Sequence, residues 1–321
     1  MKLGVMNPVL YGMGFEEALK YLNSIGVQYI EVGAGGSPGD EHLKPLELIN
    51  NPEKVQEYKD LLEKYEIEIS ALSCHGNPVH PNPEIAKKCD YEFRNAILAA
   101  EALGVDTVIG FSGCPGDSET SHYSNWVTCP WPEEFGQILE WQWNEKVIPY
   151  WKEVAAFAKE HGLTKIALEM HPGFVVYNPE TLLRLREAVG DIIGANFDPS
   201  HLFWQGINPT YAIKELEGAI HHFHAKDTKI DERNCGVNGV LDNKSYKDIK
   251  NRSWVFRTVG YGHGKEVWND MISMLKTTGY DGAISIEHED GLMSPLEGLE
   301  KAVDFLKDVL IYDNPGDMWW A

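Results

Sequence analysis

Residues 165–172 read KIALEMHP, a short apolar run that ends in an acidic side chain, Glu169, with His171 two residues later. Such a run is typical of a buried parallel strand, and its last residue lies at the carboxyl end of the sheet. Three later stretches repeat the pattern: IGANFDPSH (193–201), AIHHFHAKD (219–227) and GAISIEHED (282–290). In each of them one polar residue ends the apolar run: Asp198, His224 and Glu287.

These four strand-end residues predict a metal site. Their roughly regular spacing indicates that the fold gathers them in one mouth, where carboxylates without a cation would repel each other. Three carboxylates with one imidazole suit a hard octahedral ion better than tetrahedral Zn²⁺. We therefore expect a mononuclear centre that binds Mn²⁺, with Mg²⁺ or Co²⁺ as substitutes, and its ligands are Glu169, Asp198, His224 and Glu287.

The order of elements predicts an α/β fold. Strand-like runs are found at residues 2–6, 29–34, 68–74, 107–113, 165–170, 193–198, 220–225 and 283–288. Helical spacing fills the segments between them, and Gly often ends it. This alternation predicts one (β/α)₈ TIM-barrel domain over residues 1–321, with a C-terminal tail from about residue 312 to 321. A doubly wound open sheet is the alternative, but MNPVLYGMG (6–14) is not its phosphate-binding glycine fingerprint.

Two connections are longer than ordinary barrel loops. They run from Ser112 to about Trp131, after the fourth strand, and from Thr228 to about His263, after the seventh. Long loops in compact domains are usually functional, and both follow strands, so we expect them to cover the catalytic face. The first leads into an aromatic helix, EFGQILEWQWNEKVIPYWKEVAAF (134–157).

Composition narrows the classes of function. The formal charge of -21 argues against a nucleic-acid partner, because phosphates would be repelled. Five cysteines form no C-x-x-C pair, which fits a reducing compartment. The chain contains no long apolar segment of the kind that spans a bilayer. We expect a cytoplasmic protein with neither a nucleic-acid nor a membrane partner.

Further polar residues are candidates for catalysis. His171 lies two residues from Glu169, on the same strand face, and is the expected general base, although Glu169 or Glu287 could take that role. His201 follows Asp198 by three residues, and we expect it near the same cation or a sugar hydroxyl. Lys226 either stabilises an oxyanion or forms a structural ion pair. Residues at other strand ends and in the long loops are candidate substrate contacts: His75, Glu31, Trp204, Arg257 and Trp126.

The motifs LEMHPG, NFDPSH, HFHAKD and SIEHED together resemble the xylose-isomerase-like TIM-barrel superfamily of sugar isomerases and epimerases, over nearly the whole chain. The resemblance implies the ligand set given above. Endonuclease IV-like members need a histidine after the fourth strand, where this chain has FSGCPG (111–116). Other segments, including SCHGNP, NWVTCPWP and LEWQWNEKVIPYW, resemble the large subunit of bacterial C-glycoside deglycosidases. That likeness implies Mn²⁺-dependent cleavage of 3-oxo-glucosides of plant polyphenols, with a small β-sandwich subunit as partner.

The reactions of these families begin with the same chemical step. A divalent cation that chelates a ketone oxygen and a neighbouring hydroxyl acidifies the carbon between them, and a base then forms an enediolate. Expulsion of a β substituent is elimination, whereas reprotonation gives an epimer or an isomer. The aromatic insertions favour a substrate with a flat apolar part, and hence a lyase acting on 3-oxo-C-glucosides. A keto-sugar isomerase or epimerase is the alternative, and a non-catalytic sugar-binding barrel is a second one.

Exposed aromatic residues predict a partner protein. Four tryptophans are expected at the surface, which is more large apolar area than a monomer usually exposes to water: Trp126, Trp131, Trp319 and Trp320. We expect either a small second subunit that helps to enclose the mouth or a homo-oligomer. The expected small-molecule ligand is a sugar or glycoside.

Overall fold

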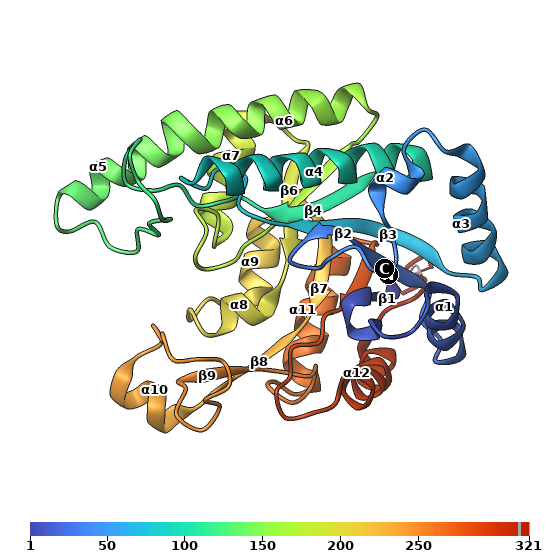
Figure 1. The fold of residues 1–321 in the computed structure, drawn as a ribbon. Coiled ribbons are helices and arrows are strands. Elements are labelled where there is room, and N and C mark those ends of the chain that lie inside the picture. Colours follow the sequence, from blue (N-terminus) through green and yellow to red (C-terminus); the bar gives the residue numbers. More distant parts are fainter. Residues whose placement is uncertain (314–315, 321) are drawn as a thin grey trace.

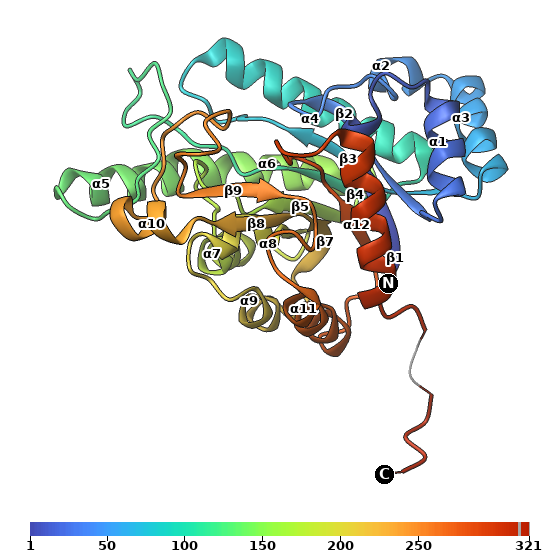
Figure 2. The same cartoon turned by 90° about the horizontal axis from the view of Figure 1, so that it is seen from below.

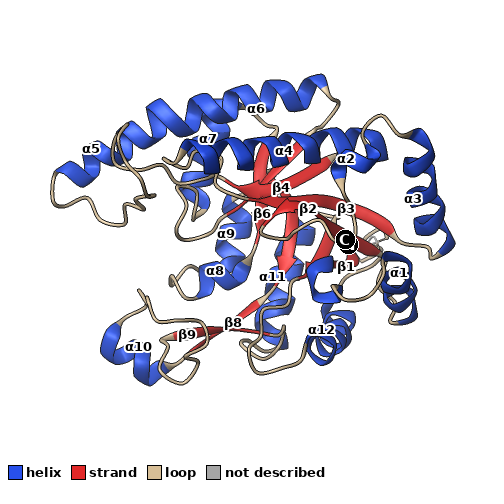
Figure 3. Ribbon diagram, in the orientation of Figure 1, coloured by secondary structure: helices blue, strands red, loops and turns tan. Residues whose placement is uncertain are grey.

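A computed structural model of the chain describes residues 1–313 and 316–320. Within them, eight parallel strands close into a barrel that helices surround (Figures 1 and 3), which confirms the predicted TIM barrel. Around the barrel, β1 closes against both β2 and β10. The barrel strands are β1 (Lys2–Met6), β2 (Tyr29–Gly36), β3 (Glu68–His75), β4 (Thr107–Phe111), β5 (Lys165–Glu169), β6 (Ile193–Phe197), β7 (Ile220–Ala225) and β10 (Ala283–Ile286).

Burial on both faces explains why the barrel strands read as nearly continuous apolar runs. Every residue of β6 and β10 is buried. The outward side chains pack on the helices in one large core, while Ala71, Ile109 and Ala167 form a small separate apolar cluster. Side chains alternate along a strand, so Glu169 lies on the same face as Ala167, one step nearer the carboxyl end.

The helices around the barrel begin and end where the sequence provides caps. Asn82 accepts a hydrogen bond from the backbone N–H of Glu84, and Gly104 ends the same helix at φ +76°. The helices are α1 (Phe15–Ser24), α2 (Pro45–Leu48), α3 (Pro52–Lys64), α4 (Pro83–Leu103), α5 (Glu134–Trp141), α6 (Ile148–Glu160), α7 (Pro179–Val189), α8 (Pro199–Phe203), α9 (Pro209–Glu215), α11 (Lys265–Thr277) and α12 (Pro295–Val309), with a 3₁₀ turn η1 (Asn7–Leu10).

The two expected long connections follow β4 and β7. The first leads into α5, which continues through a π-helical turn, η2 (Gln142–Val147), into α6, so the predicted aromatic helix has an irregular centre. The second contains an antiparallel pair of strands, β8 (Asp227–Ile230) and β9 (Trp254–Arg257), with α10 (Glu232–Asn238) between them. In Figure 1 both insertions lie toward the left of the molecule.

The C-terminal tail leaves the barrel. Residues 316–320 lie well away from the strands and helices (Figure 2), and the side chains of Trp319 and Trp320 are 87% and 70% exposed. The predicted tail also includes residues 314, 315 and 321, which lie outside the described residues. In the described part of the chain, every helix is too short or too polar to cross a membrane.

Candidate metal centre and catalytic site

The four strand-end residues meet at one point. Glu169 ends β5, Asp198 follows β6, His224 lies in β7 and Glu287 follows β10. Each offers one ligand atom, and these atoms all lie within 4.8 Å of one another. The Nδ1 atom of His224 is 3.0 Å from Oε2 of Glu287 and 3.4 Å from Oε2 of Glu169. The fold thus brings together the set of side chains that the sequence predicted as metal ligands.

The charge and burial of this cluster fit a divalent cation. Asp198 is fully buried, yet its Oδ2 atom accepts no hydrogen bond among the described residues. Burial, opposed by Lys226 and reinforced by the carboxylates of Glu287 and Glu169, raises the pKa of Asp198 to about 6. This Oδ2 oxygen has ion-pair contacts with Lys226 and His201 but no hydrogen bond among the described residues, and together with the neighbouring carboxylates it forms a donor set that a hard cation can bind.

Lys226 supplies positive charge inside the cluster. Its Nζ atom lies 3.1 Å from Oδ2 of Asp198, 2.8 Å from Oε2 of Glu287 and 3.1 Å from Oε2 of Glu289. Burial lowers the pKa of Lys226, but the three carboxylates outweigh it and raise the pKa well above its ordinary value. The position of Lys226 fits both expected roles. It forms ion pairs, as a structural role requires, and it lines the cavity beside Glu169 and Glu287, where it could stabilise an oxyanion.

Three imidazoles surround the carboxylate of Glu169. Nε2 of His75 and Nε2 of His201 lie 3.2 Å and 3.1 Å from its oxygens, and Nδ1 of His224 lies 3.4 Å from its Oε2 atom. Burial raises the pKa of Glu169, but these three rings hold it well below its usual range. Glu169 is consequently an anion at neutral pH. Nδ1 of His75 has no hydrogen-bond partner among the described residues, whereas the Nε2 atoms of His75 and His201 face Glu169.

His171 presents a neutral imidazole beside the cluster. Its Nδ1 atom lies 2.6 Å from the carbonyl oxygen of Pro172, and because a carbonyl only accepts, Nδ1 carries the proton. Nε2 is then the unprotonated nitrogen. Burial and the nearby ring of His201, whose centroid is 4.0 Å away, lower the pKa of His171 to about 4, so the imidazole is neutral at pH 7.

Three cavities share His171 as a wall. The first, about 200 Å³, adjoins the centre and is also lined by His75, Glu169, Lys226 and Glu287. The second, about 650 Å³, lies between β9 and the segment after β10, and its walls include Tyr246, Ile249, Phe256, Arg257 and Leu292. The third, about 400 Å³, lies between the two long insertions, with Trp126, His201, Trp204, Tyr246 and Trp254 among its walls.

The candidate substrate contacts fall into two groups. Trp126, Trp204, Arg257 and His75 each line one of the three cavities, and Trp204 also stacks on Trp254 with ring centroids 4.6 Å apart. Glu31 differs from expectation. It is fully buried, lines none of these cavities, and its carboxylate is taken up by His224 and by two serine hydroxyls. Glu31 is the third residue of β2, which continues to Gly36, so it lies inside the barrel below the mouth.

Sequence reasoning missed Asn196, which connects the centre to the barrel interior. Its amide nitrogen lies 3.3 Å from Oε2 of Glu169 and 3.1 Å from Nδ1 of His224, and its oxygen lies 3.0 Å from Nδ1 of His222. The sequence does contain a signal for the position of Asn196. Asn196 stands two residues before Asp198 and therefore on the same face of β6, and a polar residue inside a buried strand needs partners.

Comparisons with known proteins agree with this architecture. Residues 19–309 match the model of the xylose isomerase-like TIM-barrel family. The uncharacterized protein YfiH of Bacillus subtilis is 39% identical over 312 residues, which cover 97% of this chain and 99% of that protein. Inosose dehydratase 2 of Bacillus cereus is 24% identical over 174 residues, 53% of this chain and 56% of that enzyme.

Solved structures share the fold. The IolI protein with a bound zinc atom aligns over 97% of this chain and 98% of its own, with a TM-score of 0.65 and 21% identity. A D-tagatose 3-epimerase-like protein aligns over 96% and 98%, with a TM-score of 0.63 and 21% identity. Since the family model spans most of the chain, this protein belongs to the xylose isomerase-like TIM-barrel family.

Proposed function

We propose that this protein is a divalent-metal-dependent enzyme that removes the proton next to the carbonyl of a keto sugar. The observation that carries the proposal is the convergence of Glu169, Asp198, His224 and Glu287 beside a neutral His171. When bound, a divalent cation would polarise a substrate ketone and acidify the neighbouring carbon. Mn²⁺ is the proposed ion, and Mg²⁺ or Co²⁺ its substitutes, because three carboxylates and one histidine form the donor set.

His171 is the proposed base. Its proton-bearing Nδ1 is held by Pro172, which leaves Nε2 to accept the proton from the substrate carbon. The ammonium group of Lys226 lines the same cavity and would stabilise negative charge that develops on the substrate oxygen. Glu169 or Glu287 is the alternative base if the ring of His171 proves dispensable.

The substrate that we propose is a 3-oxo-glycoside with an aromatic aglycone, cleaved by β-elimination. The proton next to the ketone passes to His171, its electron pair forms a carbon–carbon double bond, and the bond from the β carbon to the aglycone breaks. The aglycone leaves with that bonding pair and is then protonated. Support comes from the two cavities with aromatic walls that adjoin the small polar one, since a free hexose would leave them empty.

A keto-sugar epimerase or isomerase is the second candidate. Glu169 and Glu287 come from separate strands and both line the small cavity, so one can deprotonate and the other reprotonate. Two carboxylates of this kind suit an epimerase or isomerase, in which the substrate is reprotonated and no group is eliminated.

One incubation distinguishes the candidates. The metal-loaded chain is given a 3-oxo-C-glucoside in deuterated water, with and without any small protein encoded beside it, and aglycone release and deuterium at the α carbon are measured. Release with metal dependence is expected. Exchange of the α proton without release would favour the epimerase or isomerase. Retained metal with neither exchange nor release on any keto sugar would contradict both and leave a sugar-binding barrel.

A further inference from the structure

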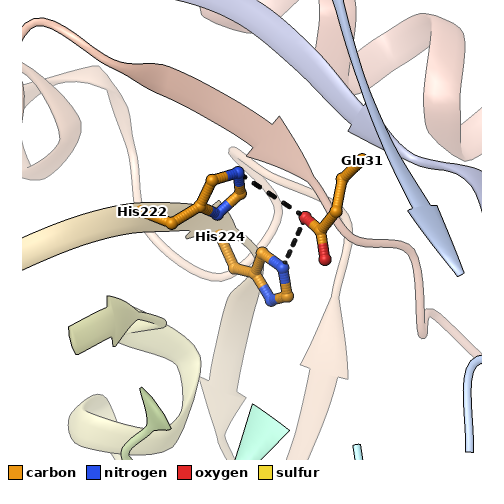
Figure 4. A group of neighbouring side chains, drawn as sticks. All are labelled: Glu31, His222 and His224. Carbon is orange, nitrogen blue, oxygen red and sulfur yellow. Dashed lines mark hydrogen bonds and ion pairs between the residues drawn. The ribbon is translucent and has the colours of Figure 1, made fainter. Parts of the chain in front are cut away.

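The buried carboxylate of Glu31 lies directly behind the histidine of the centre. Figure 4 shows Glu31 from β2 facing His222 and His224 from β7. Oε2 of Glu31 is 2.8 Å from Nε2 of His224 and 3.8 Å from Nε2 of His222. All three side chains are at most 2% exposed, so this group lies inside the barrel, on the far side of His224 from the other ligands.

Glu31 is held by hydroxyl groups from two other strands of the barrel. The hydroxyl of Ser285, on β10, donates to Oε2 at 2.9 Å, and the hydroxyl of Ser73, on β3, donates to Oε1. These two hydroxyls and the Nε2 atom of His224, at 2.8 Å, all face the oxygens of the Glu31 carboxylate, which accepts hydrogen bonds.

That constraint determines which nitrogen of His224 faces the centre as a ligand. Since Glu31 accepts, Nε2 of His224 keeps its proton, so a metal can bind this ring only through Nδ1, once that nitrogen is deprotonated. Nδ1 is the atom that lies 3.0 Å from Oε2 of Glu287 and 3.4 Å from Oε2 of Glu169. A carboxylate behind a metal-binding histidine fixes the ring's tautomer and orientation and raises its basicity as a ligand.

A second cation between Glu31, His222 and His224 is the competing interpretation, because their polar atoms also lie within 4.8 Å of one another. The hydrogen bonds argue against it. Nδ1 of His222 lies 3.0 Å from the Asn196 oxygen, and Nε2 lies 3.2 Å from the Ser70 hydroxyl. Among the described residues, none of the three side chains has a buried polar atom without a partner. A cation there would have to displace existing hydrogen bonds.

We propose that Glu31 is a positioning residue for the metal centre: it locks His224 in the tautomer that binds through Nδ1 and strengthens that bond with its negative charge. The proposal rests on the metal centre of the proposed function. Glu31 touches neither metal nor substrate, so its effect passes through His224 alone. Metal affinity is the quantity that it should change.

The test uses Mn²⁺ binding to the metal-free full chain, followed by electron paramagnetic resonance of the free ion. The isosteric variant Glu31→Gln and the truncated variant Glu31→Ala are compared with Ser70→Ala, which removes a hydrogen bond to His222 and leaves the contacts of Glu31 in place. We expect Glu31→Ala to weaken Mn²⁺ binding by about 10–100-fold and Glu31→Gln by less, since an amide oxygen can still accept from Nε2. Ser70→Ala should stay close to the native affinity.

A spectroscopic readout separates positioning from general damage. In the Co²⁺-loaded chain, the paramagnetically shifted Nε2 proton of His224 should exchange slowly with solvent, shift in Glu31→Gln and exchange rapidly in Glu31→Ala. Thermal unfolding of the metal-free variants checks folding. Native Mn²⁺ affinity in both Glu31 variants, or a loss that only follows lost folding stability, would overturn the proposal. If the native chain itself binds no Mn²⁺, the metal centre fails instead, so the two failures are distinguishable.

Discussion

At the scale of single residues, His171 is the proposed general base. Replacing it with Ala should lower kcat by about 10²–10⁴-fold, the usual contribution of a positioned general base, while the metal stays bound. Turnover and metal content of the purified variant are the measurements. A matched control is His80→Ala, which alters a histidine outside the three cavities. Near-native exchange of the substrate α proton in His171→Ala would transfer the role of base to Glu169 or Glu287.

The protonation state of His224 predicts how metal affinity depends on pH. Burial lowers the pKa of His224, but Glu31 and Glu287 outweigh it, so in the metal-free chain the pKa lies well above its ordinary value and the ring is protonated at pH 7. A metal must displace the Nδ1 proton, so affinity should rise as pH rises. Below pH 6, protonation of Asp198, whose pKa is raised to about 6 mainly by burial, should weaken binding further.

Calorimetry can measure this proton release directly. Mn²⁺ is titrated into the metal-free chain in two buffers that differ in ionisation enthalpy, at pH 6 and pH 8. Release of protons on binding, and a tighter Kd at pH 8, are the expected results. A Kd that is independent of pH over this interval would show that the ligands are already deprotonated without the metal.

Residues that touch the mouth were easier to predict than those behind it. Glu169, Asp198, His224 and Glu287 each end an apolar run, a pattern that is visible along one strand. The role of Glu31 depends on Ser73, His224 and Ser285 from three other strands, and those pairings come from barrel closure. A single strand read alone therefore places Glu31 at the wrong depth.

At the scale of elements, the two insertions should determine which substrates bind. Trp126 comes from the segment after β4, and Phe256 comes from β9; each lines an aromatic cavity beside His171. Trp126→Ala and Phe256→Ala should raise KM for an aromatic 3-oxo-glycoside and leave α-proton exchange of a small keto sugar unchanged. Steady-state kinetics with both substrates measure the difference.

Tyr123→Ala is the matched control for this prediction. Tyr123 lies on the same insertion as Trp126, but its side chain is 83% exposed and lines none of the three cavities. Its replacement should leave both KM values unchanged. Equal losses on the two substrates in the cavity variants would indicate damage to the centre and argue against a separate aglycone site.

The barrel strands were predictable because burial on both faces leaves short apolar runs, and these alternate regularly with segments of helical spacing. The segment after β7 was expected only as a long loop. Its strands β8 and β9 are four residues each and pair across an intervening segment of 23 residues, from Asp231 to Ser253. Short strands with a distant partner leave little periodicity to detect, and their pairing depends on tertiary contacts such as the stack of Trp204 on Trp254.

At the scale of the whole molecule, the exposed aromatic side chains predict association. Trp131 is 76% exposed, and Trp319 and Trp320 are 87% and 70% exposed on a tail that leaves the barrel. Large apolar groups in water favour burial against a partner. Light scattering on the chain alone, and then with a small protein encoded beside it, should give a mass above that of one chain. A monomer with full activity would contradict both the hetero-complex and the homo-oligomer.

The central claim is that Glu169, Asp198, His224 and Glu287 hold one divalent ion. The most direct test is Mn²⁺ stoichiometry and affinity of the metal-free native chain beside Glu287→Gln, with Glu289→Gln as a neighbour that contacts Lys226 but lies outside the four-residue group. We predict one ion per chain in the native protein and in Glu289→Gln, and a large loss of affinity in Glu287→Gln with unchanged circular dichroism. Undiminished binding in Glu287→Gln, or no binding by the native chain, would contradict the account.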